Sequence, residues 1–235
     1  MVSNGAFPRQ IRECLAAYEY LIAEVGVRAE KVCLMGESAG GHLALSFLVV
    51  LAGGFSLEKE NKKKGNIGEG YPRPGSLILL SPWLDLSLSS PAIPVLEKRD
   101  FISRTFLQRV GKELLRADTR LISPIGDFTA RPMERGSWVR VLPAQTWVSA
   151  GADEIFVHDI VRFVDCARED GVEVELQVEP GKCHSWQSGE AFLSARRFLD
   201  MSLQFDGEEL MPGLVGLGRL LLGSFDLGVL GVGNR

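Results

Sequence analysis

Apolar side chains along this chain follow two different spacings. Between residues 8 and 25 they recur at steps of three and four, which predicts an amphipathic helix that ends at Gly26. Short apolar stretches predict buried strands at Lys31–Met35, Leu77–Leu80 and Gln145–Ala150. A fourth strand is predicted at Val172–Val178, where apolar and polar residues alternate and β-branched residues are frequent. Further helices are predicted at His42–Leu51, Phe101–Leu115, Ile155–Glu169 and Ala191–Leu203. Strands that alternate with helices pair in parallel through right-handed crossovers, so the pattern predicts an α/β fold with a mostly parallel sheet flanked by helices.

The same alternation groups residues 1–206 into one domain. Residues 55–75 are rich in Lys, Glu, Gly and Pro, but strands and helices resume after them. We therefore interpret this stretch as a solvated loop and not as a linker. Residues 207–235 differ, because they hold eight glycines and eight leucines with little periodicity. A Gly/Leu-rich, poorly ordered tail is predicted there.

The overall composition argues against several classes of function. The 235 residues carry a formal net charge of -4, with 26 basic and 30 acidic side chains, and so lack the basic excess of a nucleic-acid-binding protein. No apolar run reaches the roughly 18 residues of a spanning helix, and the first residues lack a signal peptide's apolar segment, which favours an intracellular protein. The four cysteines form no Cys-x-x-Cys pair and the three histidines are scattered, so no metal site is expected.

Residues 36–40 read Gly-Glu-Ser-Ala-Gly, a Gly-x-Ser-x-Gly pattern between a predicted strand and a predicted helix. That context is typical of a nucleophile elbow, in which a strained turn projects the hydroxyl of Ser38 at the carboxyl end of the sheet. Gly36 and Gly40 are expected to let the two arms of the turn approach closely, and the Ala39 N–H to bind an oxyanion. The alternative is a phosphate-binding loop, but a Walker loop needs Lys and Ser/Thr after its last glycine, where this chain has a histidine.

Acidic and basic partners for Ser38 follow the later predicted strands. The third strand is followed by Asp153 and Glu154, and the fourth by His184. Because the carboxyl ends of parallel strands share one sheet edge, these side chains are expected near the serine, in the chain order serine, acid, histidine. Asp153 could instead cap the next helix, so the residues alone leave the choice between the two carboxylates open. The other two histidines lie on predicted helices and are interpreted as packing or surface residues.

Four segments in this order resemble the hormone-sensitive-lipase branch of the α/β-hydrolases, in particular its fungal members that act on esters. The segments are Gly36–Gly41, Ser81–Asp85, Gly151–Phe156 and Gly181–Trp186. The likeness runs from about residue 8 to residue 203, and Glu37 stands where the family usually has Asp. The resemblance implies an α/β-hydrolase core that hydrolyses a carboxylic ester, from a small molecule or a lipid, through an acyl-enzyme and without a metal or organic cofactor.

The resemblance also bears on the acid and on the length of the chain. The family's spacing back from Gly171-Val172 places Glu154 at the acid position, with Asp153 as the alternative. The family carries a His-Gly-Gly oxyanion loop well before its serine, and none precedes Ser38 here. We therefore expect an N-terminally truncated core. The strand Val32–Met35 would then be an unpaired sheet edge that could support a homo-oligomer or bind another chain.

Two other functions are compatible with these patterns. A truncated hydrolase without the glycine-rich loop could be weakly active or non-catalytic, because the loss of one oxyanion donor can cost about 100-fold or more in rate. An amidase or peptidase could use the same triad, because no acyl pocket is identifiable that would separate esters from amides. The most informative measurement is the turnover of a p-nitrophenyl ester by this chain beside a version extended upstream.

Overall fold

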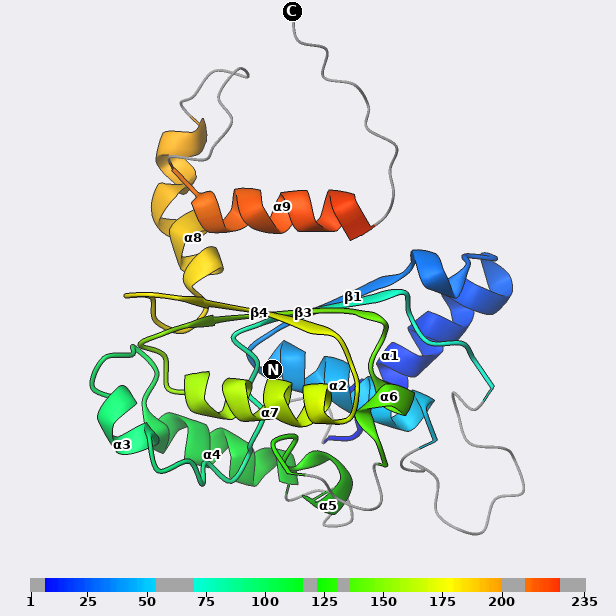
Figure 1. Ribbon diagram of the computed structural model, residues 1–235, viewed down its shortest axis with the longest axis horizontal. Helices are drawn as coiled ribbons and strands as arrows, with labels where there is room; N and C mark the ends of the chain where they lie inside the picture. Colours follow the sequence, from blue (N-terminus) through cyan, green and yellow to red (C-terminus); the bar gives the residue numbers. More distant parts are fainter. Residues whose placement is uncertain (1–6, 54–69, 116–121, 131–135, 200–209, 225–235) are drawn as a thin grey trace, which may run out of the picture. The chain divides into compact units, whose positions relative to one another are not determined.

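The computed structural model describes residues 7–53, 70–115, 122–130, 136–199 and 210–224 (Figure 1). The chain divides into two compact units, Met1–His184 and Ser185–Arg235. The first unit contains every described strand and most of the described helices. The second contains helices α8 (Trp186–Leu199) and α9 (Pro212–Ser224). This boundary falls earlier than the domain end predicted from the sequence.

The first unit is built on a four-stranded sheet in which neighbouring strands are parallel and follow the order β1-β2-β3-β4. The strands are β1 (Cys33–Glu37), β2 (Ser76–Leu80), β3 (Gln145–Gly151) and β4 (Val174–Glu179). In the register, Gly36 pairs with Leu79, and Leu79 with Val148. The predicted α/β architecture with a parallel sheet is therefore confirmed, with strand ends that differ slightly from the prediction.

Helices α1, α2 and α7 lie on one side of the sheet in the first unit (Figure 1). The main helices of this unit are α1 (Arg9–Glu19), its π-helical continuation (Tyr20–Glu24), α2 (Ala39–Leu51), α4 (Arg104–Leu115) and α7 (Val157–Glu169). Alternate side chains of β2 and β3 share one core cluster with these helices; they are Leu77, Leu79, Val148 and Ala150. The intervening side chains Ile78, Leu80 and Trp147 are buried as well, so β2 and β3 carry buried side chains on both faces of the sheet.

Short helical turns in the first unit escape prediction from periodicity. They are a 3-10 turn (Ala29–Lys31), α3 (Ile93–Leu96), α5 (Ile122–Ile125) and α6 (Trp138–Val141). Each is too short for a hydrophobic period to repeat, so no pattern could reveal it. The predicted polar loop is described only at its carboxyl end, because residues 54–69 lie outside the described residues.

Helix α9 occupies part of the segment predicted as a poorly ordered tail. The Gly213 N–H donates to Glu190 Oε2 of α8 at 3.2 Å, and Ser194 Oγ of α8 donates to the Leu210 carbonyl at 3.2 Å. A side chain at Gly213 would overlap the ring of Trp186. The frequent glycines of this segment made a helix unexpected from the sequence. Gly213 is one of them, and its lack of a side chain lets α9 pack closely against α8. The other residues of the predicted tail, 207–209 and 225–235, lie outside the described residues.

Strand β1 forms one edge of the sheet within the described part of the chain. It pairs with β2 on one side, and Met35 near its middle is 53% exposed. This arrangement matches the expected unpaired edge. Among the described residues, no helix combines the length and the apolar character that a membrane crossing requires.

Candidate active site

Ser38 lies at the sharp turn between β1 and α2. Its backbone angles, φ 54° and ψ -120°, fall outside the regions that L-residues ordinarily occupy. Such a conformation costs about 1–3 kcal/mol and persists when neighbouring contacts hold it. Here the Ser38 N–H donates to the Leu80 carbonyl at 2.9 Å, and the Ser38 carbonyl accepts from the Trp83 N–H at 3.0 Å. The end of the neighbouring strand β2 thus holds the elbow in shape.

The glycines around Ser38 have different roles. A Cβ added at Gly36 would overlap the carbonyl of Gly40, and one at Gly41 would lie 2.7 Å from Pro82 Cβ. A Cβ at Gly40 would meet nothing within 4 Å. The close approach predicted for Gly36 is confirmed. The same prediction for Gly40 is wrong, because Gly40 contributes its backbone and Gly41 is the second crowded position.

His184 lies on the loop after β4, and its Nε2 is 2.9 Å from Ser38 Oγ. The imidazole is 3% exposed and packs edge-on against Phe156, with ring centroids 5.1 Å apart. The loop crosses closely over the end of β3, where a Cβ at Gly151 would overlap the Lys182 carbonyl. Two parallel strand ends therefore bring residues distant in sequence into hydrogen-bond contact.

The two candidate carboxylates point into different environments. Glu154 is 0% exposed, and its Oε2 accepts from Ser81 Oγ at 2.6 Å and from the Gly151 N–H at 2.9 Å. The Asp153 side chain is 33% exposed and pairs with Arg99 at 3.0 Å. Among the interactions of the described residues, no hydrogen bond joins His184 to either carboxylate. Glu154 Oε1 and His184 Nδ1 are both buried without a hydrogen-bond partner there.

The Ala39 N–H is available at the start of α2. Ala39 is exposed, and its N–H makes no hydrogen bond within the described part of the chain. The first N–H groups of a helix lack intrahelical partners and carry the positive end of the helix dipole. This N–H can therefore bind a developing negative charge next to the Ser38 hydroxyl.

Comparison with known families assigns the fold. The family described as alpha/beta hydrolase fold matches residues 4–188. The chain belongs to the α/β-hydrolase family. The α/β-hydrolase fold implied by the four sequence motifs is thereby confirmed.

Two curated relatives are similar to part of this α/β-hydrolase. The protein named "Putative steryl acetyl hydrolase mug81" from Schizosaccharomyces pombe is 31% identical over 169 residues, which cover 69% of this chain and 41% of the relative. A protein named "Esterase" from Acinetobacter venetianus is 29% identical over 182 residues, which cover 77% of this chain and 52% of the relative. The chain thus spans about half of the length of these relatives.

Solved structures show the same fold at lower identity. An esterase from the bacterial hormone-sensitive lipase family matches with a TM-score of 0.70 at 21% identity, over 95% of this chain and 63% of that protein. An esterase/lipase from an uncultured bacterium matches with a TM-score of 0.69 at 21% identity, over 95% of this chain and 62% of that one. Together with the family match, these similarities support the α/β-hydrolase fold.

Burial shifts the protonation of the histidine and the buried glutamate of this α/β-hydrolase. It lowers the pKa of His184 to about 4, against the opposing charge of Asp100. It raises the pKa of Glu154 to about 8, although the hydrogen bonds from Ser81 and Gly151 favour the ionised form. In both groups the cause is the loss of solvation of the charged state. At neutral pH the imidazole is therefore uncharged, the form that can accept a proton from Ser38.

Three polar residues near the site were not assigned roles from the sequence. Ser81 follows β2 and donates to Glu154, so its position after a strand end was a usable signal. His42, interpreted as packing, is 3% exposed and its Nδ1 lies 2.9 Å from the Trp83 carbonyl oxygen, which keeps it away from base chemistry. Asp100 lies in the connection between β2 and α4, where the sequence offers no pattern that marks it.

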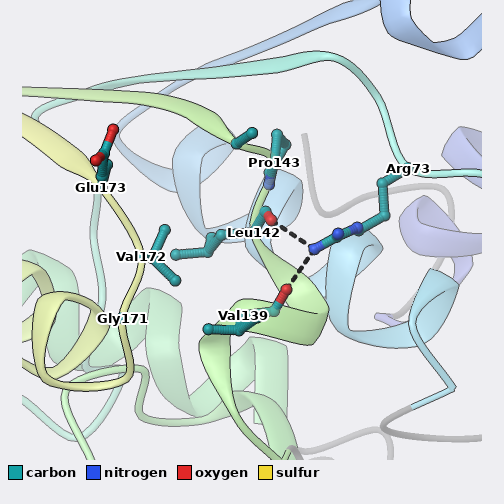
Figure 2. A pocket seen from close by; sticks show the side chains of 8 residues that line it. Arg73, Val139, Leu142, Pro143, Gly171, Val172 and Glu173 are labelled. Atoms are coloured by element: carbon teal, nitrogen blue, oxygen red, sulfur yellow. Dashed lines mark hydrogen bonds between the residues drawn. The ribbon is translucent and has the colours of Figure 1, made fainter.

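A pocket of about 330 Å³ lies at the amino ends of β3 and β4, opposite the strand ends that carry Ser38 and His184 (Figure 2). Arg73 Nη1 donates there to the carbonyls of Val139 and Leu142 at 2.6 and 2.7 Å (Figure 2). The lining holds no nucleophile and no histidine. Among the described residues, no group of three or more His, Cys, Asp or Glu side chains could hold a metal ion.

Proposed function

We propose that this chain carries a serine carboxylester hydrolase site in which Ser38 is the nucleophile and His184 the general base. The observation that carries the proposal is the 2.9 Å contact between Ser38 Oγ and His184 Nε2 at a strained elbow. A nucleophile within hydrogen-bond reach of a neutral base is the arrangement that acyl transfer requires. The esterase names of the relatives point to the same class of substrate, a small-molecule ester or a lipid.

The reaction proceeds in two halves. Ser38 Oγ attacks the ester carbonyl carbon as His184 Nε2 takes its proton, and the carbonyl oxygen becomes an oxyanion beside the Ala39 N–H. The intermediate collapses when the carbon–oxygen bond to the alcohol breaks and His184 returns the proton to that oxygen. Water then attacks the acyl-enzyme with His184 again as the base, and the acid and free Ser38 are released.

We assign the third member of the triad to Glu154. It is buried at the turn that the base loop crosses, and its Oε1 has no hydrogen-bond partner among the described residues, as is true of His184 Nδ1. Pairing of these two atoms would hold the imidazole in the required tautomer and stabilise the imidazolium. Asp153 is the alternative, but its pairing with Arg99 directs its charge away from this role.

Labelling with a fluorophosphonate probe tests the proposal. Ser38→Ala should abolish labelling and lower p-nitrophenyl acetate turnover by about 1,000-fold or more, since the nucleophile is removed. Ser89→Ala is the matched control, because this exposed serine bonds to Asp85 and lies outside the elbow. Equal labelling of Ser38→Ala and the parent would refute the assignment.

The two alternatives predict different outcomes of the same assay. A weakly active or non-catalytic hydrolase would be labelled at Ser38 yet turn over esters barely above background. This result would follow if the Ala39 N–H, the oxyanion donor identified in the described residues, were insufficient alone. An amidase or peptidase would also hydrolyse a p-nitroanilide of the same acyl group, with a turnover that Ser38→Ala abolishes, whereas an esterase would leave the anilide at background.

A further inference from the structure

We infer that Asp100 is a positioning residue of this site, which fixes the turn that carries the acid and the loop that carries the base. The inference rests on the proposed function, and it assigns a role to a residue outside the serine, acid and histidine. Asp100 does not contact Ser38. It acts through Glu154 and His184, whose backbone positions it sets.

The carboxylate of Asp100 accepts three backbone hydrogen bonds. Its Oδ2 accepts from the Ile155 N–H at 2.8 Å, directly after Glu154 in the chain. Its Oδ1 accepts from the N–H of His184 itself at 3.3 Å and from the Phe101 N–H at 2.8 Å. One side chain therefore joins the turn after β3, the loop after β4 and its own segment. Hydrogen bonds to an ionised carboxylate are stronger than those between neutral groups.

The residues on either side of Asp100 contact the same two segments, the turn after β3 and the loop after β4. Arg99 pairs with Asp153 at 3.0 Å, and the ring of Phe101 lies 6.0 Å from the His184 ring, centroid to centroid. The sequence predicts a helix from Phe101 onward, but α4 begins at Arg104 and the Ser103 hydroxyl accepts from an N–H in its first turn. Because α4 begins later than predicted, residues 99–101 lie outside the helix. Their side chains contact the turn after β3 and the loop after β4.

The charge of Asp100 also affects the base. His184 is buried, so its imidazolium form is poorly solvated, and Asp100 supplies the favourable charge that partly offsets this cost. The other titratable groups around this loop include Glu154, which is buried, Lys182, and Cys183, whose pKa is raised by burial and by Asp100 and lowered by the charge of Lys182. The imidazolium forms during catalysis, so a nearby negative charge that is fixed in place lowers the barrier.

The variant Asp100→Asn tests the hydrogen bonds and the charge of Asp100 separately from the overall stability of the fold. The amide has the same size, but it removes the charge and presents an NH₂ group to one of the three backbone donors. Amide exchange at Ile155 and His184 should accelerate about 10-fold or more, because each protecting hydrogen bond is weakened. The His184 titration midpoint, followed by NMR, should fall below the parent value because the imidazolium loses its charge partner.

The kinetic expectation is a change in kcat without a matching change in KM. Asp100→Asn should lower kcat for p-nitrophenyl acetate by about 10- to 100-fold, as expected when a base is displaced by a fraction of an ångström to one ångström. KM should remain near the parent value, since Asp100 does not line the attacking hydroxyl. The control is Asp165→Asn, the same substitution on the exposed surface of α7, which should leave exchange, midpoint and kcat unchanged.

Asp100→Glu keeps the inference testable if Asp100→Asn does not fold. The longer side chain keeps the charge but displaces both oxygens, so exchange at Ile155 and His184 should accelerate while the His184 midpoint stays near that of the parent. Parent-like amide exchange at Ile155 and His184 in Asp100→Glu would overturn the inference. Parent-like exchange together with a parent-like His184 midpoint in a folded Asp100→Asn would overturn it as well. These NMR readouts need no turnover. A parent chain without Ser38-dependent turnover would refute the proposed function alone, and the exchange data would still decide the role of Asp100.

Discussion

Asp153 and Glu154 are adjacent in the sequence but differ in solvation and in partners. Glu154 is fully buried and receives hydrogen bonds from Ser81 and Gly151, whereas Asp153 is partly exposed and paired with Arg99. A charge on Glu154 would be weakly screened and would act strongly on a nearby imidazolium. The charge on Asp153 is screened by solvent and paired with Arg99, so its electrostatic effect on the His184 imidazolium is weaker.

Glu154→Gln should lower kcat/KM by about 100-fold or more, because the amide keeps the shape but loses the charge that stabilises the imidazolium. Burial raises the pKa of Glu154 to about 8. The ionised form, and with it the parent rate, should therefore increase as the pH rises through that value, and the variant should lose this increase. The measurement is the pH profile of p-nitrophenyl ester hydrolysis, corrected for background.

Asp153→Asn is the comparison for this prediction. It removes an exposed ion pair worth about 0–1 kcal/mol of stability and should cost much less activity than the change at Glu154. A greater loss for Asp153→Asn, at equal folded fraction, would move the acid assignment to Asp153.

At the scale of elements, the elbow depends on how closely α2 approaches β1 and the end of β2. Gly36 lies in β1 where a side chain would overlap the Gly40 carbonyl, and Gly41 lies against Pro82. The small residues therefore set the distance between strand and helix, and that distance sets the direction of the Ser38 hydroxyl. Gly40 lies in the same turn with open space around it, which provides a matched position for comparison.

Gly36→Ala should destabilise the fold by roughly 1–3 kcal/mol or more, because the added methyl group overlaps backbone that cannot move without distorting the elbow. Gly40→Ala should be neutral or stabilise by up to about 1 kcal/mol, since it replaces a glycine within a helix. Urea denaturation measures both. Equal destabilisation by the two substitutions would show that the crowding at Gly36 does not control the turn.

At the scale of the whole molecule, the sheet of the first unit presents a strand edge. Strand β1 pairs with β2, and its other side has no partner strand among the described residues. Unpaired N–H and C=O groups on an edge strand can pair with another chain. The chain also spans about half of the length of its curated relatives.

We predict that the purified chain self-associates through β1. Light scattering coupled to size exclusion should show an oligomer or aggregate, and Met35→Lys should reduce its mass because charge on an edge strand opposes pairing. Val95→Lys on α3 is the control, since Val95 is 60% exposed but lies away from the edge. A monodisperse monomer for the parent chain would contradict this prediction.

The local patterns of the sequence located the four strands, most of the longer helices and the elbow. A glycine–serine–glycine turn between a strand and a helix is a local feature, so Ser38 could be proposed as the nucleophile without knowledge of distant contacts. His184 followed from one rule of parallel sheets, which places the carboxyl ends of all strands at the same edge. The short α3, α5 and α6 and the helix α9 could not be read this way, because their stability comes from packing and not from periodicity.

The tertiary structure decided the environments on which the chemistry depends. Neither the burial of Glu154 nor the pairing of Asp153 is visible in a sequence where the two are neighbours. The role inferred for Asp100 depends on contacts with Ile155 and His184, which are 55 and 84 positions away in the chain. Hydrogen bonds over such separations arise from the register of the strands and the paths of the loops, and no short stretch of residues encodes either.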